Sequence, residues 1–105
     1  MNIQVTKPAL QWFKDEFNLK EKDEYIRFFA RYGGCGSIQS GFSLGIHHEE
    51  EKPVSIGARE ETDGIVFFIA EEDIWYFKGY DLKVKYSRKN EEIEFVYEES
   101  SEQAD

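Results

Sequence analysis

Residues 25–46 read YIRFFARYGGCGSIQSGFSLGI, and the pattern of their side chains decides which fold class we expect. The opening YIRFFARY has β-branched and aromatic residues on both faces, which is typical of a strand inside a sheet. From Ile38 to Ile46, apolar residues alternate with small or polar ones, which predicts a half-buried strand. Glycines flank Cys35, the only cysteine in the sequence. The segment therefore predicts two strands joined by a glycine turn.

A short strand and one helix are expected before this segment. Residues 2–5 favour a strand, and Thr6 is a typical cap for a helix N-terminus. Pro8 fits the first helical turn, where its missing N–H has no partner to lose. Apolar residues then recur at helical spacing, and they are Ala9, Leu10, Trp12, Phe13 and Phe17. Asn18 is a typical residue at a helix end.

The sequence after residue 46 predicts a long loop, a buried strand and a short helix. Residues 47–64 (HHEEEKPVSIGAREETDG) are mostly polar, so we expect a surface loop with at most one short strand at residues 54–56. IVFFIA (65–70) is a continuous apolar run and predicts a strand. EEDIWYFKG (71–79) predicts a short helix, with acids in its first turn and a glycine stop.

Residues 82–97 alternate apolar with polar side chains on both sides of the turn RKNEE, which predicts a closing hairpin. The complete order of elements predicts a β-rich α+β fold, a mixed and antiparallel β-sandwich with an N-terminal helix and a short second helix. The 105 residues suffice for one domain, and nine Phe, six Tyr and two Trp supply its core. We expect this domain to span residues 1–97 and the acidic tail 98–105 to be disordered.

The charge balance excludes one class of partner. There are 13 basic and 22 acidic side chains, whereas binding to a phosphate backbone depends on clustered Lys and Arg, so nucleic acid is not expected. The sequence has no apolar run long enough for a membrane span, and MNIQVTKPAL does not resemble a signal peptide. A lone cysteine cannot form an internal disulfide. We therefore expect a cytoplasmic protein with no membrane partner.

The residues around Cys35 leave two interpretations open. Flanking glycines would let backbone N–H groups converge on the sulfur, which favours the thiolate that binds metals and attacks electrophiles. The same glycines also describe a tight turn that carries a small apolar residue. A closed zinc or iron–sulfur site needs four ligands, mostly thiolates, which one chain cannot supply. Cys35 from two chains would bring two thiolates, and His47, His48 or nearby carboxylates would complete an open, labile site, although the spacing does not support one.

The other polar residues near the turn supply neither a catalytic base nor a chelating pair. His47 and His48 are neighbours at a strand end, where adjacent side chains point to opposite faces, so we do not expect them to hold one ion together. His47 also lies too far along the strand to act as a base for Cys35, and no catalytic residue is predicted. Arg27 and Arg31 share one strand face, and they either pair with internal acids or support a thiolate.

IRFFARYGGCGS (26–37) resembles the signature of the HesB/IscA-like iron–sulfur biogenesis proteins, in which a Leu-Arg-Leu-x-Val-Arg strand runs into a small-residue turn that holds a cysteine. Residues 62–86 and 93–97 are similar to the family's later strands and short helix. The resemblance covers about residues 2–97 and implies a HesB-like fold. Members that hold iron have a C-terminal Cys-Gly-Cys pair. This chain has YEESSEQAD there, which resembles the YneR-like single-cysteine branch.

The resemblance implies a non-catalytic protein that handles iron or an iron–sulfur cluster. Cys35 would be the ligand, at the interface of a homodimer, and iron–sulfur assembly or recipient proteins would be its partners. The alternative function is a protein-interaction module that has the same fold and has lost metal binding. A redox or thiol-reactive role for Cys35 ranks below both, because no base is expected beside the sulfur.

Overall fold

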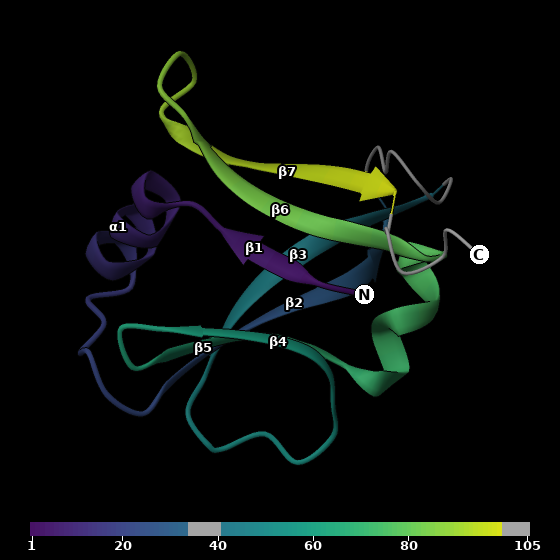
Figure 1. The fold of residues 1–105 in the computed structure, drawn as a ribbon, viewed down its shortest axis with the longest axis horizontal. Coiled ribbons are helices and arrows are strands. Elements are labelled where there is room, and N and C mark those ends of the chain that lie inside the picture. The colour runs from purple at the N-terminus through teal and green to yellow at the C-terminus, as the bar shows by residue number, and fades with distance from the viewer. Residues whose placement is uncertain (34–40, 100–105) are drawn as a thin grey trace.

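The computed structural model describes residues 1–33 and 41–99. In chain order these residues form β1 (Ile3–Val5), α1 (Lys7–Glu16), β2 (Glu24–Tyr32), β3 (Phe42–Glu49), β4 (Ile56–Thr62), β5 (Ile65–Ala70), the 3-10 helix η1 (Glu71–Phe77), β6 (Tyr80–Ser87) and β7 (Glu92–Glu99). Strands predominate, so the expected β-rich α+β class is confirmed (Figure 1). Neither described helix is long and apolar enough to cross a membrane.

The strands form two mixed sheets. The first has the order β1-β6-β7, in which β1 is parallel and β7 antiparallel to β6, so the predicted closing hairpin is confirmed. The second has the order β3-β2-β5-β4, in which β2 is antiparallel to β3 and parallel to β5. β2 therefore lies inside its sheet, as the apolar residues on both of its faces predicted.

The core lies between the two sheets and against α1. Phe28 of β2 is fully buried, and its ring centroid lies 5.9 Å from that of Phe13 in α1 and 6.1 Å from that of Phe67 in β5. It also lies 5.6 Å from the ring of Phe95 in β7. Aromatic pairs at these separations contribute stability in addition to the stability that comes from burying their apolar surface. A single side chain thus contacts the helix and both sheets.

The bounds of α1 agree with the predicted helix. The Thr6 hydroxyl accepts a hydrogen bond from the Ala9 N–H at 3.4 Å, and Pro8 lies in the first turn. The helix is capped at its C-terminus by Phe17, and Asn18 follows with a positive φ of 53°. Asn tolerates this left-handed conformation better than most residues, which explains the stop.

Residues 56–62 correct one prediction. We expected a loop there, with at most a short strand at residues 54–56, but β4 runs from Ile56 to Thr62 and pairs with β5. Asp63 and Gly64 connect the two strands, and both have positive φ angles, of 51° and 75°. Positive φ at both positions is what a two-residue type I′ hairpin turn requires. The Asp-Gly pair before the apolar strand was the signal that identifies the hairpin.

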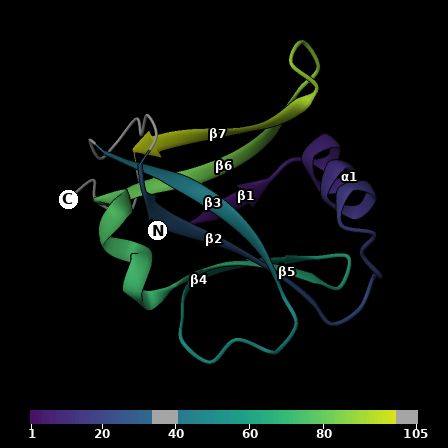
Figure 2. The ribbon, with the colours of Figure 1, turned by 180° about the vertical axis from the view of Figure 1, so that it is seen from behind.

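The connection formed by residues 50–55 joins β3 and β4, which lie at opposite edges of the second sheet. Figures 1 and 2 show it on the side of that sheet that faces away from β6 and β7. We call this side the outer face. Val66 and Phe68 alternate with the core residue Phe67 and so point to the outer face, yet they are only 6% and 2% exposed. The strand predicted at residues 65–70 is therefore confirmed, and it is buried on both faces.

Replacing Phe28 with alanine should lower the free energy of unfolding by about 3–5 kcal/mol, because a buried ring is lost and a cavity remains where three elements meet. Urea denaturation followed by circular dichroism measures the change. Val54→Ala is the matched control, since Val54 is 97% exposed and its truncation should change stability by less than about 0.5 kcal/mol. Equal effects of the two substitutions would contradict the role given to Phe28.

Candidate functional site

Cys35, the residue predicted to bind iron or a cluster, lies among residues 34–40, outside the described part of the chain. The strands that lead into and out of this segment are described. The Gly33 N–H donates a hydrogen bond to the Gly41 carbonyl at 2.6 Å, and the Ser43 hydroxyl donates one to the Gly33 carbonyl at 3.0 Å. These bonds join the ends of β2 and β3 at the base of the segment.

Three aromatic side chains lie together beside these strand ends. The ring of Tyr32 packs edge-to-face against Phe42 of β3, with 5.5 Å between centroids, and Phe42 packs in the same way against Trp75 of η1 at 5.2 Å. Tyr32 is 85% exposed and Trp75 is 49% exposed. We call Tyr32, Phe42 and Trp75 the aromatic surface. A contiguous exposed group of large apolar side chains is typical of a binding site rather than of ordinary surface.

η1 carries Trp75 and closes one end of the space between the sheets. The predicted short helix is confirmed, and its first turn holds the acids Glu71, Glu72 and Asp73. Tyr76 and Phe77 are fully buried, and their rings lie 6.2 and 6.1 Å from that of Tyr97 in β7. These buried residues fix η1 against the core. Trp75 is thereby held at the rim, where half of its surface meets solvent.

An ion pair ties η1 to the outer face of β2. Arg27 donates hydrogen bonds from Nη2 to the carboxylates of Asp73 at 2.8 Å and Glu72 at 3.2 Å. The hydrogen bond to Asp73 raises the pKa of the Arg27 guanidinium, although burial acts in the opposite direction. The guanidinium also lies 5.9 Å from the centroid of the Phe29 ring. Pairing with internal acids, one of the two roles left open for Arg27, is therefore the one observed. Arg31 lies on the same strand face and is exposed.

His47 and His48 lie on opposite faces of β3. His47 is opposite Arg27 on the outer face and contacts Glu49, whereas His48 contacts the Glu24 carboxylate on the other face at 2.9 Å. Burial raises the pKa of Glu24, but hydrogen bonds from the Lys20 N–H and from His48 outweigh it and lower the pKa overall. Each histidine is thus engaged with its own carboxylate. Across residues 1–33 and 41–99, no three His, Asp or Glu side chains are arranged to hold a metal.

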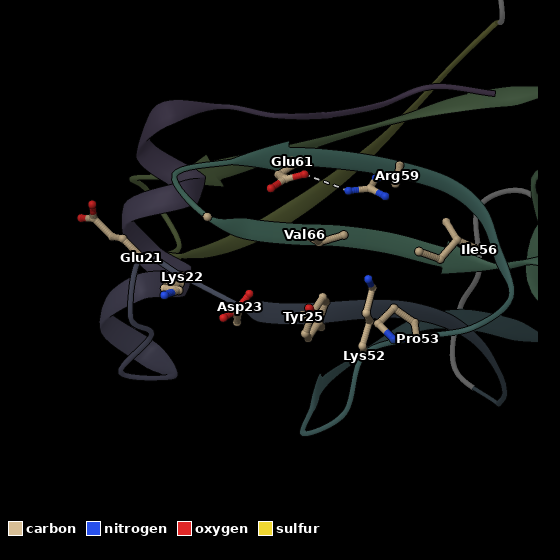
Figure 3. A pocket seen from close by; sticks show the side chains of 11 residues that line it. Glu21, Lys22, Asp23, Tyr25, Lys52, Pro53, Ile56, Arg59, Glu61 and Val66 are labelled. Atoms are coloured by element: carbon tan, nitrogen blue, oxygen red, sulfur yellow. Dashed lines mark hydrogen bonds and ion pairs between the residues drawn. The ribbon is translucent and has the colours of Figure 1, made fainter.

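A pocket of about 330 Å³ lies on the outer face of the second sheet (Figure 3). Tyr25 and Val66 lie on the strands beneath it, and Lys52 and Pro53 approach from the connection between β3 and β4. Its charged lining residues are Lys22, Lys52, Arg59, Glu21, Asp23 and Glu61. Because cations and acids are balanced, the pocket does not select a ligand by charge. The pocket could not be predicted from the sequence, because its residues come from separate segments.

This chain is similar over nearly its whole length to proteins of Bacillus and Staphylococcus. It is 46% identical over 98 residues to a Bacillus subtilis (strain 168) protein named "Pyruvate dehydrogenase inhibitor", and the alignment covers 93% of this chain and 100% of that relative. It is 35% identical to an uncharacterized protein of Staphylococcus haemolyticus, with 90% and 96% of the two chains covered. An uncharacterized protein of Staphylococcus saprophyticus is 36% identical, with 91% and 98% covered. No family model matches the chain.

Replacing Arg27 with methionine should lower the free energy of unfolding by about 2–4 kcal/mol, because the buried Asp73 carboxylate loses its partner. The double variant Arg27→Met/Asp73→Asn should recover part of this loss, and urea denaturation of the single and double variants measures the coupling. Arg31→Met is the matched control on the same strand face, and its effect should stay below about 0.5 kcal/mol. Strictly additive effects at Arg27 and Asp73 would show that the pair does not anchor η1.

Proposed function

Because the chain belongs to the same protein family as the Bacillus subtilis pyruvate dehydrogenase inhibitor, we propose that it inhibits pyruvate dehydrogenase by binding to that enzyme. The observation that carries the proposal is 46% identity over the full length of this relative. Since the alignment covers all of the relative, the domain shared with this chain is the domain that carries the relative's named function.

The aromatic surface supports inhibition by binding rather than by catalysis. Aromatic side chains are enriched in protein interfaces, and exposed Trp and Tyr contribute much of the binding energy there. Tyr32 and Trp75 are exposed side chains of this kind, and they lie together at one end of the molecule. This proposal takes up the alternative given by the sequence, a non-catalytic protein-interaction module.

A second candidate function is binding of iron or an iron–sulfur cluster through Cys35. It is favoured by the resemblance to the HesB/IscA-like proteins, together with the arrangement of two packed mixed sheets and of β2 and β3 on either side of the cysteine segment. In this candidate the domain is HesB-like. A homodimer supplies Cys35 from each chain, and iron–sulfur assembly or recipient proteins are the partners.

We expect the purified chain to slow pyruvate turnover by purified pyruvate dehydrogenase, in proportion to the fraction of enzyme in complex. Steady-state rates measured over a range of chain concentrations give the inhibition constant. The Bacillus subtilis relative serves as the positive control, and an unrelated acidic protein of similar size controls for charge alone. Full enzyme activity with an excess of this chain, under conditions where the relative inhibits, would contradict the proposal.

Anaerobic incubation with iron and sulfide should produce visible absorption with the native chain and none with Cys35→Ser, if the thiolate is a ligand. The same variant separates the two functions, because inhibition through the aromatic surface should be unchanged by Cys35→Ser. Absorption that does not depend on the cysteine, or no absorption at all, would remove the second candidate. A Cys35→Ser protein that no longer inhibits would instead place the thiol within the inhibitory function.

A further inference from the structure

We propose that the aromatic surface is the docking surface for the protein partner, and that the partner presents an apolar hollow bordered by Lys or Arg side chains. The inference rests on the proposed function, since it names the surface that performs the inhibition and the chemistry of the surface that receives it. Three observations carry it: the exposure of the rings, the contacts that support them and the charge around them.

Exposure distinguishes this cluster from the rest of the described surface. In the part of the chain that the structure describes, the large hydrophobic side chains that stand exposed are Tyr32, Val54 and Trp75. Val54 lies on the connection between β3 and β4 and is 97% exposed, and single exposed apolar residues are ordinary. Tyr32 and Trp75 are bridged by Phe42, so they present one continuous patch.

Contacts within the described part of the chain support the patch from inside. Phe42 holds Tyr32 on one side and Trp75 on the other in edge-to-face contacts, and η1 is fixed by its buried residues and by the Arg27–Asp73 pair. Side chains that are already ordered lose less conformational entropy on binding, so more of the contact energy appears as affinity. An exposed Trp with such support is a typical interface hot spot.

The charge around the patch specifies its partner. Glu71 lies in η1, and Glu98 and Glu99 lie at the end of β7, where Glu99 pairs with Tyr80, the first residue of the strand that follows η1. These three side chains are exposed and form no ion pair within the described residues. Figures 1 and 2 show η1, the end of β7 and the adjoining ends of β2 and β3 at the same end of the molecule.

On β2 and next to η1, the exposed cationic side chains among the described residues are Arg31 and Lys78, against the three exposed glutamates, and the whole chain has a net charge of −9. Binding of an acidic rim is favoured when the partner's rim is basic, and the pairing raises the rate of association at low salt. The pocket in Figure 3 has no such excess of one sign.

Tyr32→Ser and Trp75→Ala test the apolar part of the surface. We expect each to weaken both binding to purified pyruvate dehydrogenase and inhibition of it by about tenfold or more. Val54→Ser is the matched control, because it removes an even more exposed apolar side chain elsewhere and should change neither quantity. Thermal unfolding of each variant confirms that it is folded. Tyr32 is 85% exposed, so its variant keeps the test decisive if Trp75→Ala is unstable.

The charge is tested separately by the double variant Glu98→Gln/Glu99→Gln. It should bind the enzyme more weakly than the native chain at low salt, and the difference should shrink as salt is added. Glu50→Gln/Glu51→Gln changes the net charge by the same amount on the connection between β3 and β4, and it should bind like the native chain. Equal losses from both double variants would show a general effect of charge and would overturn the assignment of a basic rim to the partner.

The outcomes separate this inference from the proposed function. If the native chain inhibits and the Tyr32 and Trp75 variants inhibit equally well, the docking surface is wrong while the function stands. If Val54→Ser is as damaging as Tyr32→Ser, the assignment to the aromatic surface is also wrong. If the native chain neither binds nor inhibits the enzyme, the function fails and the inference fails with it.

Discussion

The contact of Phe28 with rings from α1, β5 and β7 is the interaction on which the rest of the structure depends. It is the point where the helix and both sheets meet, and it fixes which face of β2 is turned inward. Because side chains alternate along a strand, the neighbouring Arg27 must then point to the outer face, where it reaches Asp73. The same strand ends at Tyr32. One inner contact therefore determines how η1 is anchored and where the aromatic surface is presented.

Much of the fold could be predicted because its signals are local. The Thr6 cap, Pro8 in the first turn and the unbroken apolar run of β5 act within a few residues of the elements they define. β4 could not be recognised from its charged sequence alone, because its identity as a strand comes from pairing with β5 across the Asp63–Gly64 turn. Elements with local sequence signals were thus predicted correctly. β4 was missed because it is defined by its pairing with a neighbouring strand.

The candidate site was less accessible to prediction for the same reason. Arg27 and Asp73 are 46 positions apart, so the sequence left the partner of the arginine open. The aromatic surface is built from two strands and η1. Each of its three side chains, taken alone, is of a type that is common in protein cores. Only exposure in the folded chain distinguishes Tyr32 and Trp75 from the buried Phe67 or Tyr76. The two candidate functions are also close in the sequence, since Tyr32 and Phe42 lie on either side of residues 34–40, which include Cys35.

The order of the strands has a consequence for how this protein behaves at high concentration. β4 and β7 are edge strands, and an open edge offers unpaired backbone groups to any other chain that approaches. These two strands are rich in charged side chains, with Arg59, Glu60 and Glu61 on β4 and four glutamates on β7. If two copies paired through these edges, like charges would be brought together and would repel each other. The charges that made β4 resemble a loop in the sequence are therefore a defence against edge-to-edge aggregation.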